Sequence, residues 1–235
     1  MTDDLFDDRA VRGQSLTRET VQALIARLAP GTGAGHLVDC DGDETDLSGL
    51  DLWGWTFERC SFRRAKFTGA RLEGVKWLSC RGAFADFQGA DLTDALFRGC
   101  DFNNGMFRRA TLNSAAFAGC KLTGADLSEA RTLHVRFEEV LLINAKLPGH
   151  SFRKLTLNRV DFGQADLRKC DFRDSVFEAS SLRDANMAGC RFEGADLRGA
   201  DLGGLRLVDA GRFRGATISR EQAGQLLAEL GLNVR

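Results

Sequence analysis

Cysteine, histidine and acidic side chains are the groups in this 235-residue chain that could bind a metal or act as nucleophiles. The cysteines are regularly spaced: five of them follow one another at intervals of twenty residues, and the last two are also twenty apart. None forms a C-x-x-C pair, and the ligand spacing of a zinc site is absent. We therefore expect small apolar side chains that fill tight interior positions. The cysteines are Cys40, Cys60, Cys80, Cys100, Cys120, Cys170 and Cys190.

An acidic segment at residues 39–46 reads DCDGDETD and resembles a calcium-binding loop. Its glycine is misplaced for such a loop, and the twelfth position is Leu50 where a glutamate is required. A solvated acidic turn is therefore expected. The histidines His36, His134 and His150 are scattered, and no serine or cysteine has the local sequence of an activated nucleophile. The chain is predicted not to be an enzyme and to hold no metal or cofactor.

The elements that must position these side chains follow a period of five residues. Every fifth position from Leu47 to Leu207 is large and apolar, except Gly82 and Thr132. A second lattice of small residues, mainly Ala and Cys, lies two positions earlier. A period of five fits neither a helix nor a flat strand. We expect a chain that turns a corner every five residues, so that four sides return it above its start.

Coils of twenty residues would stack at the β spacing of about 4.8 Å, with each large residue pointing inward onto its copy in the next coil. The prediction is an all-β solenoid, a quadrilateral parallel β-helix of about eight coils, with a short α-helical segment near each terminus. One extra residue after Leu207, assigned to Gly211, would shift the phase to Phe213 and Ile218. The predicted core stack includes Phe57, Phe62, Phe67, Phe97, Phe102, Phe107, Phe117, Phe152, Phe172 and Phe192.

The repeat unit, A-(D/N)-(L/F)-x-G, is seen cleanly in Ala125-Asp126-Leu127, and it resembles the signature of the pentapeptide-repeat family. The resemblance implies a right-handed β-helix. It extends to the members of the family that confer fluoroquinolone resistance or toxin immunity. Those proteins bind DNA gyrase and topoisomerase IV, and they are thought to do so as mimics of duplex DNA.

The chain divides into three predicted segments: an acidic tail and capping helix (1–46), the repeat β-helix (47–216) and a C-terminal capping or dimerisation helix (217–235). The first helix is predicted from Arg18 to Ala29 with Thr17 as its cap. Its apolar side chains should cover the first coil, together with Trp53 and Trp55.

The C-terminal helix begins with a predicted capping box formed by Ser219 and Gln222, and Gly231 is placed to end it. Covering the open end of the solenoid is one role for this helix. The resemblance implies a second role, in which a similar segment joins two molecules end to end as a homodimer. The residues that would form this dimer are Leu227, Leu230, Leu232 and Val234.

Irregular positions are candidate contact surfaces. Phe84 is expected to fold inward and fill the space left at Gly82. Between Arg131 and Leu155 several apolar residues should point outward, which local repacking or a partner surface would explain equally well. The candidate partner surface comprises the apolar Leu133, Leu141 and Ile143 and the acidic Asp91, Asp94, Asp171 and Asp174.

The formal net charge of −1 gives no support to a large basic surface for nucleic acid or an acidic membrane. The N-terminus lacks the order of a signal peptide, and no apolar run is long enough for a membrane span, so a cytoplasmic protein is expected. Two functions stay open. One is binding to DNA gyrase or topoisomerase IV as a DNA-like rod, conferring drug or toxin resistance. The other is a general protein-interaction scaffold, which the charge-balanced sides favour.

Overall fold

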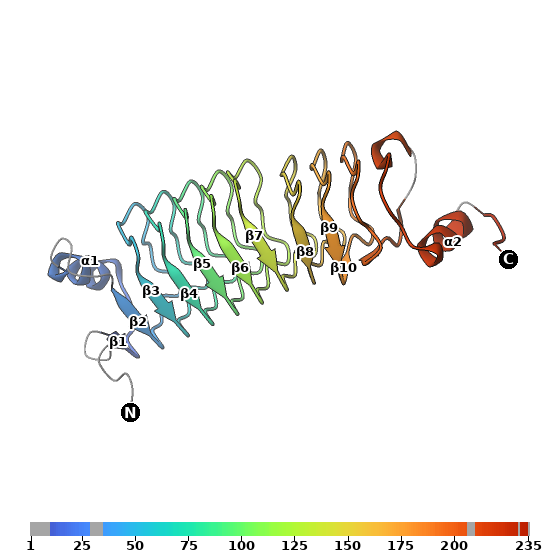
Figure 1. Cartoon of the computed structure of the whole chain (residues 1–235). Helices are drawn as coiled ribbons and strands as arrows, with labels where there is room; N and C mark the ends of the chain where they lie inside the picture. The colour runs from blue at the N-terminus through green and yellow to red at the C-terminus, as the bar shows by residue number, and fades with distance from the viewer. Residues whose placement is uncertain (1–9, 29–34, 206–209, 230, 235) are drawn as a thin grey trace, which may run out of the picture. The chain divides into compact units, whose positions relative to one another are not determined.

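The computed structural model describes residues 10–28, 35–205, 210–229 and 231–234 (Figure 1). It is a parallel β-solenoid of about eight coils with two short α-helices, as the five-residue period predicts. The coils fall into two compact units, residues 1–136 and 137–235, which we call unit 1 and unit 2.

Each strand is short and occupies one side of a coil. Unit 1 contains β1 (Ala10–Arg12), α1 (Arg18–Arg27), β2 (His36–Val38), β3 (Thr56–Glu58), β4 (Lys76–Leu78), β5 (Leu96–Arg98) and β6 (Ala116–Ala118). β7 (Arg136–Glu138) begins at the last residue of unit 1, and unit 2 continues with β8 (Thr156–Asn158), β9 (Val176–Glu178), β10 (Ser180–Ser181), β11 (Ala200–Asp201), the 3₁₀ helix η2 (Ala210–Phe213) and α2 (Arg220–Glu229).

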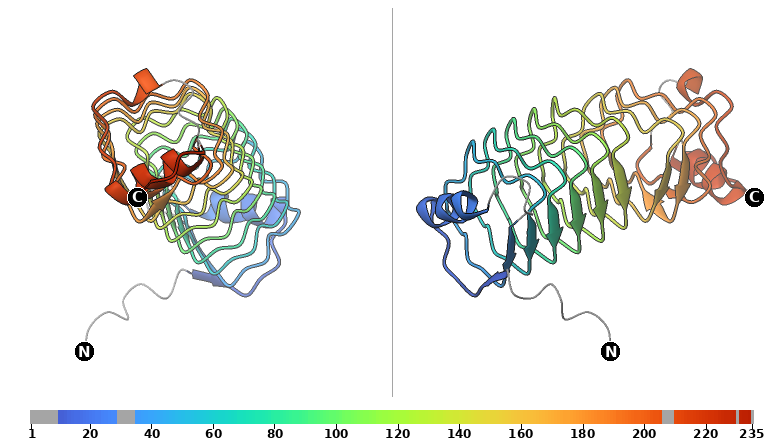
Figure 2. Two further views of the ribbon diagram at one scale, coloured as in Figure 1. Left: turned by 90° about the vertical axis from the view of Figure 1, so that its right-hand side faces the viewer. Right: turned by 60° about the vertical axis from the view of Figure 1, so that its left-hand side comes forward.

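Backbone hydrogen bonds join each coil of unit 1 to the next in parallel register. Phe57 pairs with Trp77, twenty residues on, and Leu96 pairs with Ala116 in the same way. The other three sides are joined by single bridges with the same spacing, such as Asp46 to Lys66. Because the spacing is constant, equivalent side chains stand directly above one another, and Figure 2 shows the four-sided path of the coils.

In nearly every described repeat the corner depends on one residue in the left-handed region. In the turn that starts at Phe62, the Ala65 N–H donates to the Phe62 carbonyl at 3.1 Å, and Arg64 between them has a φ of 57°. The equivalent position in the next repeat is Gly69, with a φ of 63°. Glycine reaches this conformation without steric cost, which explains its frequency two residues after the large apolar residue.

The parallel ladder begins before Leu47, in the segment assigned above to the tail and cap. β2 pairs with β3, β1 pairs with β2, and Leu16 is buried. The helix α1 then starts after Thr17, whose hydroxyl accepts from the Thr20 N–H at 3.2 Å, as a helix cap should. It ends at Arg27, two residues before the predicted end, which lies outside the described residues.

Unit 2 repeats the same architecture with one change of spacing near its end. The ring of Phe192 stacks on that of Phe213 at 4.9 Å, and Asp196 bridges to Thr217, both at a separation of twenty-one residues. The predicted one-residue insertion is thereby confirmed. α2 follows directly, and Figure 1 shows it beside the last coil of this unit.

Candidate interaction surface

The interior is filled by stacked side chains. Phe97 stacks on Phe117 at 4.6 Å between ring centroids, and Phe152 stacks on Phe172 at 4.9 Å. The other phenylalanines of the predicted core stack are buried as well. Burial of each such side chain contributes about 1.5–3 kcal/mol to folding. The inward side chains of the repeats therefore stabilise the fold.

Sulfur atoms form a hydrogen-bonded column at one corner of unit 1. At the other corners a backbone N–H donates to the carbonyl three residues earlier, as Ala65 does to Phe62. At this corner the Cys80 N–H donates instead to the sulfur of Cys100, at 3.4 Å. The thiol of Cys100 in turn lies 3.3 Å from the Trp77 carbonyl. All seven cysteines are buried and free, and burial raises the pKa of the Cys40 thiol. Within the described residues, no group of three His, Cys, Asp or Glu side chains is arranged to hold a metal ion.

Ser180 makes equivalent hydrogen bonds at the same corner position in unit 2. Its hydroxyl accepts from the Val160 N–H at 3.0 Å and donates to the Leu157 carbonyl at 2.9 Å. The sequence pattern presents the corner positions only as small residues. The pattern does not show that at this corner the backbone N–H has no carbonyl partner three residues earlier, which is why the corner side chain accepts its hydrogen bond.

His150 is the bulkiest polar side chain at a corner position and is almost fully buried. Its Nδ1 lies 3.4 Å from the Pro148 carbonyl, and its Nε2 has no hydrogen-bond partner among the described residues. Burial lowers the pKa of this imidazole below its ordinary value of 6.5. The ring is therefore neutral in the folded protein at physiological pH.

The acidic turn at residues 39–46 is part of a coil, and arginines of the next coil bind its carboxylates. Arg59 contacts Asp39 at 2.8 Å and Arg63 contacts Asp43 at 2.5 Å. The hydrogen bond from Arg59 lowers the pKa of Asp39. These carboxylates are neutralised by protein groups and do not converge on a common point.

The four acidic residues of the predicted partner surface lie in different units and have different partners. In unit 2, Asp171 pairs with Arg173 at 2.6 Å, and Asp174 pairs with Arg153 at 3.5 Å. In unit 1, one oxygen of Asp91 accepts from the backbone and hydroxyl of the residue two positions on. Asp94 is exposed and has no ion pair among the described residues. The carboxylates of Asp171 and Asp174 are therefore each neutralised by an arginine.

The apolar part of that surface is also divided between the units. Leu133, in unit 1, is 64% exposed. Leu141 and Ile143 lie together in unit 2, where Leu141 is 37% exposed and Ile143 is half-buried. Leu141 lines an open groove of about 690 Å³ that runs along Gly199–Asp201, a feature absent from the sequence prediction.

The C-terminal helix both covers the last coil and leaves apolar residues exposed. The Gln222 side-chain amide donates to the carbonyls of Leu197 and Ala200, each at 2.7 Å. The predicted capping box is present: the Gln222 N–H donates to the Ser219 hydroxyl, and the Gln222 Oε1 accepts from the Ser219 N–H. Of the predicted dimer residues, Leu227, Leu232 and Val234 are exposed. Leu230 lies outside the described residues.

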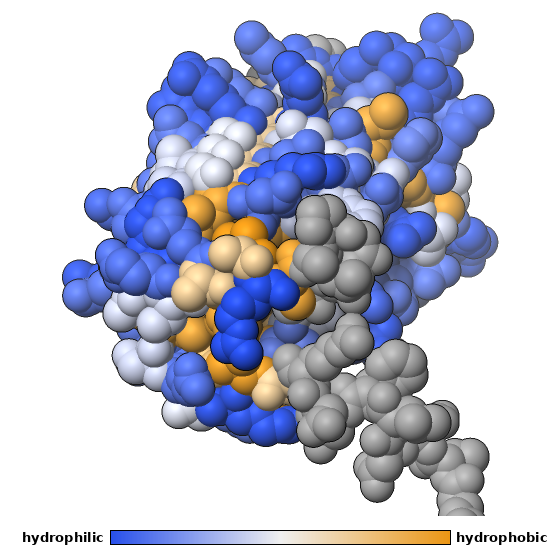
Figure 3. Space-filling view, turned by 90° about the vertical axis from the view of Figure 1, so that its left-hand side faces the viewer, coloured by the Kyte–Doolittle hydropathy of each residue, from blue (hydrophilic) through white to orange (hydrophobic). Residues whose placement is uncertain are grey.

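The N-terminal end of unit 1 also shows apolar surface, which appears orange in Figure 3. Trp55 packs beneath this end at 6.1 Å from Phe57 and is buried. Trp53 is 55% exposed, so the prediction that Trp53 and Trp55 both pack with the helix side chains on the first coil is wrong for Trp53. The side chain lies at an outward position of its repeat.

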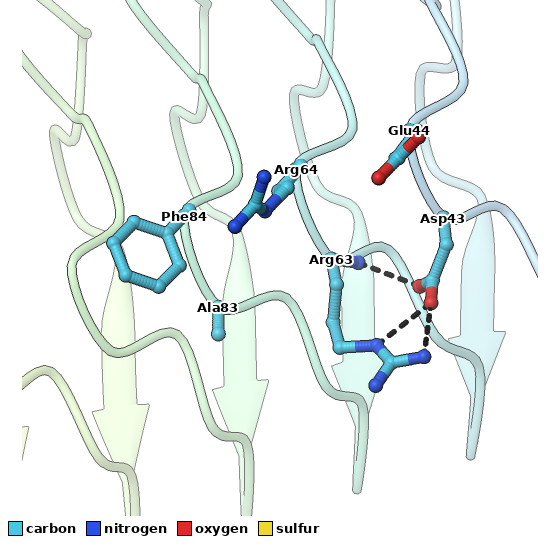
Figure 4. A pocket seen from close by; sticks show the side chains of 6 residues that line it. All are labelled: Asp43, Glu44, Arg63, Arg64, Ala83 and Phe84. Atoms are coloured by element: carbon cyan, nitrogen blue, oxygen red, sulfur yellow. Dashed lines mark hydrogen bonds and ion pairs between the residues drawn. The ribbon is translucent and has the colours of Figure 1, made fainter.

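Phe84 does not fold inward, contrary to the prediction from the sequence. It is 51% exposed, and the space at Gly82 is filled by the ring of Phe102 from the next coil. Phe84 instead lines a hollow of about 360 Å³ with Asp43, Glu44, Arg63, Arg64 and Ala83 (Figure 4). The sequence signal available was a phenylalanine at a position normally occupied by glycine or a polar residue.

No helix among the described residues is long and apolar enough to cross a membrane.

Three family models match the chain. They are described as "Pentapeptide repeats (8 copies)" over residues 39–76, "Pentapeptide repeat region" over 90–166 and "Pentapeptide repeats (9 copies)" over 157–201. No curated protein matches the sequence.

Among solved structures, trypsin-treated QnrB1, described as a plasmid-mediated fluoroquinolone resistance protein, matches with a TM-score of 0.71 at 24% identity. The match covers 86% of this chain and 98% of QnrB1. Full-length QnrB1 gives a TM-score of 0.69 at 21% identity, covering 85% and 100% of the two chains.

Proposed function

Because the chain belongs to the pentapeptide-repeat family, we propose that it is a non-enzymatic binding protein that acts through the outward side chains of its coils. The observation that carries this proposal is the division of each repeat. In most repeats two of the five positions are buried, as at Phe62 and Ala65, and the other three are at least partly exposed. Since the inward positions maintain the fold, recognition falls to the outward ones.

The proposed partner is a type II topoisomerase, either DNA gyrase or topoisomerase IV. The support is the fold shared with QnrB1, described as a fluoroquinolone resistance protein, over nearly the whole of that chain. In this role the stacked coils would take the place of duplex DNA on the enzyme, without contacting nucleic acid directly. The protein would act in the cytoplasm and protect the enzyme from a drug or a toxin.

A homodimer joined through the C-terminal segment is part of this proposal. Leu227, Leu232 and Val234 are exposed on or after α2, while Leu226 of the same helix is buried. Exposed apolar side chains that lie next to one another mark contact surfaces. The coils of two molecules would then present a longer surface to the enzyme.

A general protein-interaction scaffold is the second candidate, and the pairing of charges favours it. A DNA mimic needs strong negative potential in order to bind a site built for phosphates. Here many surface carboxylates are bound by arginines, as in the pairs of Arg71 with Asp51 and of Arg198 with Asp196. A surface of compensated charges suits a protein partner of mixed charge.

A gyrase supercoiling assay with and without ciprofloxacin tests the topoisomerase proposal. We expect the purified protein, at micromolar concentration, either to inhibit supercoiling or to restore it in the presence of the drug. The matched control is a type I topoisomerase, whose relaxation of the same plasmid should not change. If the protein has no effect on gyrase or on topoisomerase IV, with or without the drug, the topoisomerase proposal fails and the scaffold is retained.

A further inference from the structure

Phe84 occupies a conformation that its residue type disfavours. Its φ is 62°, in the left-handed region, where bulky side chains are rare. Among the described non-glycine residues with positive φ, it is the only large apolar one; the others are polar or charged, except Ala179. Residues held in such sparsely populated conformations cluster at functional sites.

The core does not require this side chain. The ring of Phe102 lies where a side chain at Gly82 would be, so the interior of this coil is already filled. Phe84 is exposed, and its side chain leaves the core unaffected. Neither packing nor turn geometry accounts for a phenylalanine here.

Arg64 lies next to Phe84, at the same position one coil earlier. Its guanidinium carbon is 5.8 Å from the centre of the Phe84 ring, within the range of a cation–π interaction (Figure 4). Stacking holds the guanidinium while leaving N–H groups at its edge for a ligand. Within the described part of the chain, Arg64 makes no ion pair.

The neighbouring charges define what would fit beside this pair. Arg63 is held by Asp43, with its Nε at 2.7 Å from a carboxylate oxygen, and so forms a fixed wall of the hollow. Glu44 lines the opposite end. The hollow therefore offers one guanidinium without an ion pair among the described residues, that of Arg64, beside an aromatic ring, and Glu44 lies at its other end.

We propose that Arg64 and Phe84 form a docking site for an acidic segment of a protein partner. Arg64 binds the carboxylate of an aspartate or glutamate, and Phe84 packs against an apolar side chain next to it in the segment. Arginine is enriched among the residues that dominate binding energy at interfaces, and phenylalanine is enriched at interface cores.

Fluorescence anisotropy with the labelled peptide EDLFDE, and with QNLFNQ as its uncharged counterpart, tests the site on the full chain. We expect EDLFDE to bind and QNLFNQ to bind at least tenfold more weakly, because a hydrogen bond between two charged groups is stronger than one to a neutral amide. Arg64→Gln and Phe84→Asn should each weaken binding of EDLFDE about tenfold. Asparagine suits the left-handed backbone, so the second variant keeps the turn.

Arg109→Gln is the matched control. Arg109 is an exposed arginine with a φ of 58° on another side of unit 1, where it pairs with Glu129. This variant should bind EDLFDE as the unmodified chain does. The proposal is overturned if EDLFDE does not bind at about 1 mM, if Arg64→Gln and Phe84→Asn bind normally, or if Arg109→Gln loses as much affinity. It is also overturned if a single-stranded oligonucleotide binds more tightly than EDLFDE and shows the same dependence on Arg64 and Phe84.

Discussion

The ring of Phe102 occupies the space that a side chain at Gly82 would need, so one coil completes the core of the coil before it. Replacing Gly82 by leucine, the residue that the repeat favours, should therefore destabilise the protein. Overpacking of this kind costs about 1–3 kcal/mol. The measurement is the midpoint of urea unfolding. Adding Phe102→Ala should recover part of the loss, and a Gly82→Leu variant as stable as the original would show that the core can rearrange.

Ser180 is expected to stabilise unit 2 through its hydroxyl. Ser180→Ala leaves the Val160 N–H without its partner at a buried corner, which should cost about 1–3 kcal/mol. Ser180→Cys should cost less, because cysteine thiols occupy the same corner in unit 1. Urea unfolding of the two variants compares them directly. A cysteine variant as unstable as the alanine variant would contradict the hydrogen-bonding role of this corner.

The buried His150 should make the protein less stable in mild acid. Its pKa is lowered in the folded state, so below about pH 6.5 the unfolded chain takes up a proton that the folded chain does not. This contribution to stability is full above pH 6.5 and is lost as the pH falls toward the lowered pKa. His150→Cys, which restores a small corner residue, should reduce the change in unfolding midpoint between pH 7.5 and 5.5.

The control for this pH effect is His134→Asn, which removes an exposed imidazole. It should leave the pH dependence unchanged. If the His150→Cys variant lost as much stability between pH 7.5 and 5.5 as the original, then His150 would not be the group responsible.

Light scattering should give a mass about twice the 25.7 kDa of the chain. Leu232, 54% exposed, belongs to the proposed dimer contact, so Leu232→Glu should reduce the mass to that of a monomer. Leu133→Glu, a change at another exposed leucine, should not. A monomeric mass for the unmodified chain at high concentration would rule out the dimer.

The five-residue period was sufficient to predict the coils and the phase shift near the C-terminus. Those features depend on inward side chains that repeat with constant spacing, as Phe192 and Phe213 show. The period does not show how a large side chain fills space in the neighbouring coil. For this reason the sequence predicts that Phe84 fills the space at Gly82, whereas in the structure the ring of Phe102 fills it.

The contacts on the outer surface were less predictable, because the rotamer of each long side chain determines which neighbouring residue it reaches. Counting charges along the sequence indicates balance, but it does not show that Arg173 pairs with Asp171 on its own coil while Arg153 reaches Asp174 on the next. The sequence does not predict the Arg64–Phe84 contact for the same reason. Spacing fixes which residues share a column, whereas their contacts depend on the directions of the side chains.

The buried cysteines give the solenoid a set of internal reporters for local opening. A thiol that lies inside a coil can react with an alkylating reagent only when that coil separates from its neighbours. Cys40 is near the beginning of the ladder and Cys190 is near its end. Consecutive cysteines are twenty residues apart, except for one interval of fifty between Cys120 and Cys170. Mass spectrometry of the order in which the cysteines are modified would therefore reveal where the native protein begins to fray.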